Sequence, residues 1–270
     1  MRNIKSIVSE AVDLGEKRLN KSAGMTSISA FIAGLYVTFG GLVALSVVAI
    51  ISSVTGSHQL GWFVGSMFYP IGFLFVVIGR SELFTENFLL PVLSVWEADS
   101  KGTHMEIIRL WVFGFVFNII GVLVMSYLVY VTGLLSTHAN LGTEVVNEVV
   151  RVASHDLQPP FLSMFGKAIF AGLFINFMSW LIVACEDSFS KFVIVWITTF
   201  PIMLLGTYHS IVGSGEILIG IMHGAPVTYL EWVKNFLVPV ALGNHVGGVV
   251  FVAALHYLKI FIYRLSEPVD

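Results

Sequence analysis

Long apolar stretches, separated by short polar connections, make up most of the chain. Each reaches the roughly 20 residues that a helix needs to cross a bilayer. They lie near residues 26–53, 61–97, 105–134, 161–185, 189–222 and 236–262. Polar residues and glycines interrupt the second and fifth stretches, and a break at membrane depth is tolerated only where it lines water or packs inside protein. The pattern predicts an all-α membrane protein with six transmembrane helices, of which the second and fifth are broken.

A different pattern precedes the first long stretch. Apolar side chains, among them Ile4, Val8 and Ala11, recur at helical spacing over residues 3–20, which predicts an amphipathic helix. This helix can lie on the cytoplasmic face of the membrane or pack against the end of the helix bundle. The predicted organisation is an N-terminal amphipathic helix, a single transmembrane channel domain and a cytoplasmic tail, over residues 1–22, 23–263 and 264–270.

Composition supports a membrane protein that does no chemistry of its own. Of the 270 residues, 56% are hydrophobic and 11% are charged, whereas a soluble domain carries about 25% charged residues. Carboxylates and histidines do not cluster, and the chain lacks a basic stripe, a zinc-ligand spacing and a phosphate-binding loop. We therefore expect membrane lipid as a partner, and no enzymatic activity, cofactor, metal or nucleic acid.

Lysine and arginine predict the orientation. Lys17, Arg18 and Lys21 precede the first long stretch, whereas the connection at 52–61 has neither residue type. Because positive charge is enriched in cytoplasmic segments, both termini are predicted to be cytoplasmic, in the inner or plasma membrane. The longest connection, residues 136–160, then lies outside.

The two halves of the chain resemble each other in three places, in the same order. The matching segments are Ala33-Gly34-Leu35-Tyr36-Val37 with Ala171-Gly172-Leu173-Phe174-Ile175, Tyr69-Pro70-Ile71 with Phe200-Pro201-Ile202, and Asn118-x-x-Gly121 with Asn244-x-x-Gly247. Because each copy has three spans, which is an odd number, the second copy must run through the membrane in the opposite direction. This predicts an inverted 3+3 repeat over about 26–135 and 161–262. In such folds the site lies near the midplane, where the broken helices meet.

Charge inside the second stretch marks a candidate pathway. The segment Gly79-Arg80-Ser81-Glu82-Leu83-Phe84-Thr85-Glu86-Asn87 follows a long apolar run. A charged side chain at membrane depth is costly unless it faces a cavity or a partner. We hypothesise that Arg80 pairs with Glu216 in the fifth stretch. In the alternative, Arg80 extends to the cytoplasmic interface and leaves Glu216 without it.

Together with the repeats and the breaks, a set of motifs resembles the formate/nitrite transporter family from about residue 25 to 262. The motifs are Glu82-Leu83-Phe84-Thr85, Asn118, Asn176, His209-Ser210-Ile211 and Pro239-Val240-x-x-Gly243-Asn244-x-x-Gly247-Gly248. The resemblance implies an aquaporin-like protomer, a homopentamer with one pore per protomer, and passage of small monovalent anions such as formate, nitrite, hydrosulfide or lactate, often with a proton. Arg80, Tyr208 and Gly213 depart from the better-known members. The variants that resemble the family's YfdC-like branch are Arg80, Thr85-Glu86-Asn87 and Val212-Gly213-Ser214-x-Glu216-Ile217-Leu218.

The resemblance also implies roles along the substrate pathway. His209 is the central pore histidine, able to donate a hydrogen bond or a proton, and Thr85 offers a hydroxyl to an anion. Apolar constrictions are expected from Leu83, Phe84, Phe73 and Tyr69, and buried amides that hold free backbone groups from Asn118, Asn176 and Asn244. Lys167 is a candidate external cation, although it departs from the family, whose lysine lies further outward on the fourth span. Each has a purely structural alternative, namely a satisfied core histidine, a helix cap, core packing or a lysine at the interface.

Two other functions remain open from the sequence. A neutral small-solute pore requires Arg80 to be neutralised and His209 to stay uncharged. A haem-binding membrane subunit requires two histidines from different helices. His245 and His256 lie on nearly the same helix face, and His209 from the fifth stretch could approach either of them.

Overall fold

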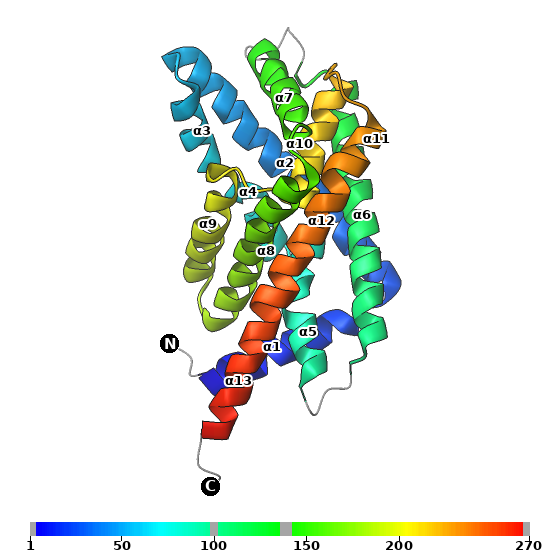
Figure 1. The fold of residues 1–270 in the computed structure, drawn as a ribbon, viewed down its shortest axis with the longest axis vertical. Coiled ribbons are helices and arrows are strands. Elements are labelled where there is room, and N and C mark those ends of the chain that lie inside the picture. The colour runs from blue at the N-terminus through cyan, green and yellow to red at the C-terminus, as the bar shows by residue number, and fades with distance from the viewer. Residues whose placement is uncertain (1–3, 98–101, 136–141, 267–270) are drawn as a thin grey trace.

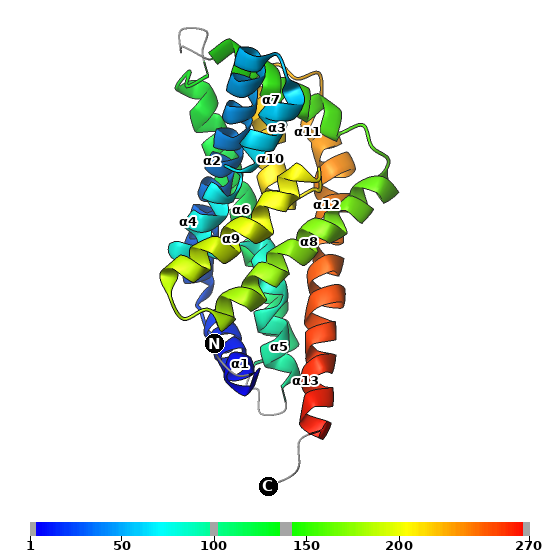
Figure 2. The same ribbon diagram turned by 90° about the vertical axis from the view of Figure 1, so that its left-hand side faces the viewer.

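The computed structural model describes residues 4–97, 102–135 and 142–266, and every regular element in this part of the chain is helical. The helices form an elongated bundle (Figure 1). At one end of the bundle, α1 (Ile4–Leu19) lies beside the last turns of α13 (Ala254–Ser266), and α7 (Gly142–Asp156) lies at the opposite end (Figure 2). The outermost residues of both predicted terminal segments, 1–3 and 267–270, lie outside the described residues.

Apolar helices long enough to cross a membrane account for most of the bundle. Three of them are continuous α-helices, α2 (Ala23–Thr55), α6 (His104–Val131) and α8 (Phe161–Ala184). The last run, Tyr229–Ser266, is one apolar rod in which α-helical and π-helical segments alternate. Its segments before α13 are α11 (Tyr229–Glu231), η2 (Trp232–Leu237), α12 (Val238–His245) and η3 (Val246–Ala253).

The second and fifth apolar stretches each consist of separate helices. The second contains α3 (His58–Ser66), α4 (Pro70–Ile78), the 3-10 turn η1 (Phe84–Phe88) and α5 (Leu90–Trp96). The fifth contains α9 (Ser188–Leu204) and α10 (Ser210–Met222). After α4 the backbone turns at Arg80, whose φ of 52° is rare for a residue with a Cβ, and after α9 it turns at Gly206, with a φ of 61°. Both non-helical segments therefore begin with a left-handed residue.

Glycines bring the continuous helices into backbone contact. A Cβ at Gly34 would lie 2.2 Å from the Asn118 carbonyl oxygen, and one at Gly172 would lie 2.3 Å from the Asn244 carbonyl oxygen. The α2–α6 crossing in the first half and the α8–α12 crossing in the second are thus built in the same way. Small residues at such crossings let transmembrane helices approach closely.

The N-terminal helix packs against the bundle rather than standing apart from it. Val8, Ala11 and Leu19 are buried, and a Cβ at Gly15 would lie 2.2 Å from the Leu90 carbonyl oxygen of α5. The helix thus packs on the end of the bundle, and its place on the cytoplasmic membrane face stays a prediction.

We expect Gly34→Ala to lower the free energy of unfolding by about 1–3 kcal/mol, because the new methyl group forces α2 and α6 apart. Gly24→Ala in the same helix is the matched control, since a Cβ there meets nothing within 4 Å. Thermal unfolding in detergent compares the two. Equal melting temperatures for both variants would contradict the close crossing.

Candidate permeation site

The two breaks meet at a buried polar contact between side chains inside the bundle. The Thr85 hydroxyl oxygen and His209 Nε2 lie 2.7 Å apart, and both side chains are buried. Thr85 belongs to η1, whereas His209 is the residue that caps the N-terminus of α10. Residues 124 positions apart in the sequence therefore form one site.

Hydrogen bonds around His209 determine where its proton lies. The Val212 backbone N–H donates to His209 Nδ1 at 3.2 Å, so Nδ1 is an acceptor and the neutral ring carries its hydrogen on Nε2. Nε2–H then donates to Thr85, and the Thr85 hydroxyl hydrogen is left to donate elsewhere. A second proton on the ring would break this cap and place a cation at the positive end of α10.

Asn118 closes the first break. Its side-chain oxygen accepts from the Phe84 backbone N–H at 2.8 Å, and its nitrogen donates to the carbonyl oxygens of Ala30 at 2.7 Å and Glu82 at 3.0 Å. These bonds satisfy backbone groups that the break leaves without helical partners.

Asn244 does the same at the second break. Its oxygen accepts from the Ser210 backbone N–H at 2.9 Å, and its nitrogen donates to the Ala168 and Tyr208 carbonyl oxygens, each at 2.8 Å. Each amide thus binds the carbonyl oxygen of the residue before, and the N–H of the residue after, one central residue. That central residue is Leu83 in the first half and His209 in the second.

The third predicted amide, Asn176, joins the site to α8. Its side-chain nitrogen donates to the Thr85 carbonyl oxygen at 3.1 Å and to the Gly172 carbonyl oxygen at 2.8 Å. Its buried side-chain oxygen has no partner among the described residues. The main-chain position of Thr85 is thus fixed from a second side.

Apolar side chains surround the Thr85–His209 contact. Phe73 meets the His209 ring edge-on with ring centres 5.2 Å apart, and Tyr69 packs on Phe73 at 5.6 Å. Leu83 is fully buried. Phe84 differs from this group, because it packs edge-on against Phe88 and Phe115 within the bundle.

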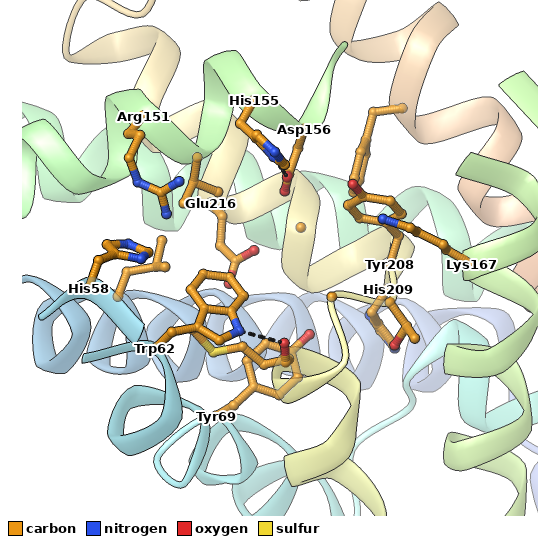
Figure 3. Close-up of a pocket in the computed structure, with 17 residues that line it drawn as sticks. His58, Trp62, Tyr69, Arg151, His155, Asp156, Lys167, Tyr208, His209 and Glu216 are labelled. Atoms are coloured by element: carbon orange, nitrogen blue, oxygen red, sulfur yellow. Dashed lines mark hydrogen bonds and ion pairs between the residues drawn. The ribbon is translucent and has the colours of Figure 1, made fainter. Parts of the chain in front are cut away.

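A cavity of about 250 Å³ connects this contact with the α7 end of the bundle (Figure 3). His209 lines it, and so do other predicted pathway residues and several that the sequence did not single out. The predicted residues are Tyr69, Lys167 and Glu216, and the others with ionisable or polar side chains are His58, Trp62, Arg151, His155, Asp156, Thr207 and Tyr208.

Most charges around the cavity are paired. Arg151 binds both oxygens of the buried Glu148, at 2.7 and 3.0 Å, and His58 Nε2 lies 3.3 Å from the same carboxylate. Burial alone would raise the pKa of Glu148, but the hydrogen bond and charge of Arg151, together with His58, hold that pKa below its usual range. Lys167 has instead an aromatic partner, since its Nζ lies 5.4 Å from the Tyr208 ring centre.

The hypothesised Arg80–Glu216 pair is wrong. Arg80 is exposed at the turn that follows α4, and it takes part in no ion pair among the described residues, whereas Glu216 faces the cavity. The chain turns at Arg80, where the backbone is left-handed, and the segment that reaches the site follows only after this turn. The Arg80 side chain therefore stays outside the site. Arg80 is thus exposed and separate from Glu216, and its place at the cytoplasmic interface stays a prediction.

The carboxylates of the first break have other partners, which sequence reasoning missed. Arg18 binds Glu86 at 2.8 Å and the Asn87 side-chain oxygen at 2.6 Å, and Lys21 binds Glu82 at 2.5 Å. Burial opposes the charge on Arg18, but the two glutamates outweigh burial and raise its pKa. The sequence did contain an indication of these pairs, because two basic residues end the N-terminal segment and two carboxylates interrupt the second apolar stretch.

The histidines proposed for a haem site have separate surroundings. His245 packs edge-on against Trp111 at 4.6 Å and Phe88 at 4.9 Å. His256 lies over Trp180 at 4.4 Å, and its Nδ1 is 2.9 Å from the Val252 carbonyl oxygen. Each ring is held in the bundle by its own contacts, so the geometry does not favour this alternative.

Comparison with known proteins identifies the family of the chain. The family model for formate/nitrite transporters matches residues 5–258. The chain belongs to the formate/nitrite transporter family. A probable formate transporter from Methanothermobacter thermautotrophicus is 30% identical over 259 residues, covering 91% of this chain and 93% of that protein.

Further family members resemble the chain in sequence or in fold. The inner membrane protein YfdC of Escherichia coli, from the predicted branch, is 28% identical over 247 residues, or 91% of this chain and 75% of that protein. A pentameric formate channel solved with formate bound has a TM-score of 0.75 at 21% identity, covering 88% of this chain and 98% of its own. An ion channel of the same family has a TM-score of 0.79 at 20% identity, covering 95% and 98%.

We expect Arg18→Ala to cost about 3–5 kcal/mol of stability, because it leaves the Glu86 carboxylate buried without its counter-charge. Lys17→Ala is the matched control: Lys17 is the neighbouring residue and forms an exposed pair with Asp13, and such pairs contribute little. Urea unfolding in detergent measures both variants. A loss as small for Arg18→Ala as for Lys17→Ala would contradict the anchoring role.

The Glu148 contacts predict acid sensitivity at the α7 end. Because the pKa of Glu148 is lower in the folded protein than in the unfolded chain, its stabilisation is present above about pH 4.3 and is lost as the pH falls through the folded value. Glu148→Gln removes this dependence and costs about 1–3 kcal/mol at pH 7. Unfolding measured at pH 7 and pH 3.5 tests it. Glu144→Gln, in the same helix, is expected to behave as wild type at both.

Proposed function

We propose that this protein is a channel or secondary transporter for a small monovalent anion such as formate, nitrite or hydrosulfide. The observation that carries this proposal is the Thr85–His209 contact, which leaves one hydroxyl hydrogen free to donate next to His209, the residue of the pair that lines the cavity. A donor surrounded by apolar side chains favours a small, partly dehydrated acceptor such as a monovalent anion. The relatives described as formate transporters and channels support this assignment.

In this proposal, different residues act on the anion one after another along its path. Lys167 brings positive charge to the cavity, where it raises the local concentration of anions. Phe73 and Leu83 then oppose hydrated ions, because no polar group replaces the lost water on their side. The Thr85 hydroxyl compensates with a directed hydrogen bond, which His209 orients by donating to the same oxygen. Since conduction requires release as well as binding, one neutral donor serves better than a fixed charge.

The arrangement in the membrane follows the same proposal. Six membrane-crossing segments form an inverted 3+3 repeat, for which the corresponding hydrogen bonds of Asn118 and Asn244 are the structural support. The N-terminal helix and the end of α13 lie at one end of the bundle, which we place in the cytoplasm, and α7 then lies outside. The single transmembrane domain over 23–263 assembles as a homopentamer, as does the related formate channel, in the inner or plasma membrane.

A neutral-solute pore is the second candidate. It is favoured by one observation, the uncharged state that the Val212 hydrogen bond imposes on His209. Flux of an uncharged solute that does not change with pH would support it.

We expect Thr85→Val to reduce formate or nitrite flux into proteoliposomes by at least about tenfold, because it removes the donor and leaves His209 Nε2–H unpaired. Thr85→Ser keeps the hydroxyl and is expected to retain most of the flux. Size-exclusion chromatography establishes that each variant is assembled. Equal flux in the valine and serine variants would contradict the role of the hydroxyl, and no anion flux in the assembled wild-type protein would overturn the proposed function.

A further inference from the structure

One carboxyl group in the cavity has no partner. Glu216 lies two turns into α10 and is half-buried, and among the described residues its side chain makes neither a hydrogen bond nor an ion pair. Figure 3 shows its carboxyl group between the α7 residues and the Trp62 ring, directed into the cavity. A half-buried carboxyl group that faces a cavity without a partner in the protein can interact with whatever enters that cavity.

The backbone of α2 leaves the space that Glu216 occupies. A Cβ at Gly41 would lie 3.0 Å from Glu216 Oε1 and 3.3 Å from its Cγ. Glycine at this position lets the carboxyl group lie flat against α2, with its other side open to the cavity. The orientation of Glu216 is therefore built into the helix crossing.

The ionisable groups that face this cavity come from five parts of the fold, and most are engaged with one another. They are His58 on α3, Tyr69 before α4, Arg151, His155 and Asp156 on α7, Lys167 on α8, and Tyr208 and His209 before α10. Arg151 and His58 bind Glu148, and His155 binds Asp156 at 3.1 Å. Among the described residues that line the cavity, Glu216 is thus the carboxyl group that remains free to exchange a proton.

His209 is poorly placed to supply a proton itself. Its Nδ1 is occupied by the Val212 N–H and its Nε2–H by Thr85, so gaining a proton at Nδ1 breaks the cap of α10, and releasing the Nε2 proton removes the hydrogen bond to Thr85. An anion that is to cross the apolar segment as its conjugate acid therefore needs another donor, upstream of His209.

We infer that Glu216 is this donor, and that it makes the flux of weak-acid anions rise at low pH. The inference rests on the proposed function. The O–H bond of the Glu216 carboxyl group breaks and an O–H bond forms on the oxygen of the anion, so that formate leaves as formic acid and Glu216 becomes a carboxylate. Glu216 then takes a proton from water of the external solution, which reaches it through the cavity. For inward flux, one proton moves with each anion.

The experiment measures anion flux into proteoliposomes at equal internal and external pH, at pH 5 and pH 7, with protein-free vesicles subtracted. Formate is the anion of a weak acid, and chloride is the anion of a strong acid that accepts no proton. The variants are Glu216→Gln, which keeps the shape and removes the proton, and Glu216→Asp, which keeps the proton. Glu231→Gln is the control, because Glu231 lies outside the cavity and glutamine also serves in its capping box.

We expect wild-type formate flux to be at least about tenfold higher at pH 5 than at pH 7, and this ratio to fall to about one in Glu216→Gln. Glu216→Asp restores the dependence, Glu231→Gln leaves it unchanged, and chloride flux does not fall in Glu216→Gln. An unchanged formate ratio in Glu216→Gln overturns the inference while leaving anion transport intact. Equal losses of formate and chloride flux also overturn it, since they indicate a structural role. Absence of any wild-type anion flux instead overturns the proposed function, and the inference with it.

Discussion

The structure depends on satisfying the backbone groups that two broken helices expose inside a membrane. Water is absent there, so each free N–H and carbonyl must find a partner within the protein. Asn118 and Asn244 provide these partners in the same way, each accepting from one N–H after the break and donating to two carbonyl oxygens. An amide is suited to this task because it offers an acceptor and two donors on one rigid plane. Without these bonds the breaks would be too costly to keep.

The two breaks are built alike but differ in the side chain at their centre. Leu83 and His209 occupy corresponding positions, yet one is apolar and the other caps a helix and contacts Thr85. The capping bond keeps the imidazole neutral, which turns it into a fixed hydrogen-bond donor. The site is thus a directed dipole in apolar surroundings, and the charges lie in the cavity above it and in the salt bridges at the opposite end.

Those salt bridges connect the N-terminal helix to the first break. Arg18 and Lys21 neutralise Glu86 and Glu82, and the Arg109 guanidinium donates to the Leu19 carbonyl oxygen at 2.6 Å. The same short segment, residues 82–87, is therefore held by α6 through Asn118 and by α1 through charge. A helix outside the predicted spans takes part in placing Thr85.

The sequence by itself determined the helical class, the positions of the breaks and the identity of the residues that serve them. Charge and glycine inside apolar stretches are costly enough to be recognised without a structure, and the amides recur at matching distances in the two halves. Partner choice was decided only by the tertiary structure. Arg80 and Glu216 were reasonable partners by charge, but the left-handed turn at Arg80 leaves it exposed. Likewise, the contact of His209 with Thr85, and the lack of a partner for the Glu216 carboxyl group among the described residues, follow from how distant segments pack. Periodicity gives the face of a helix and not what packs against it.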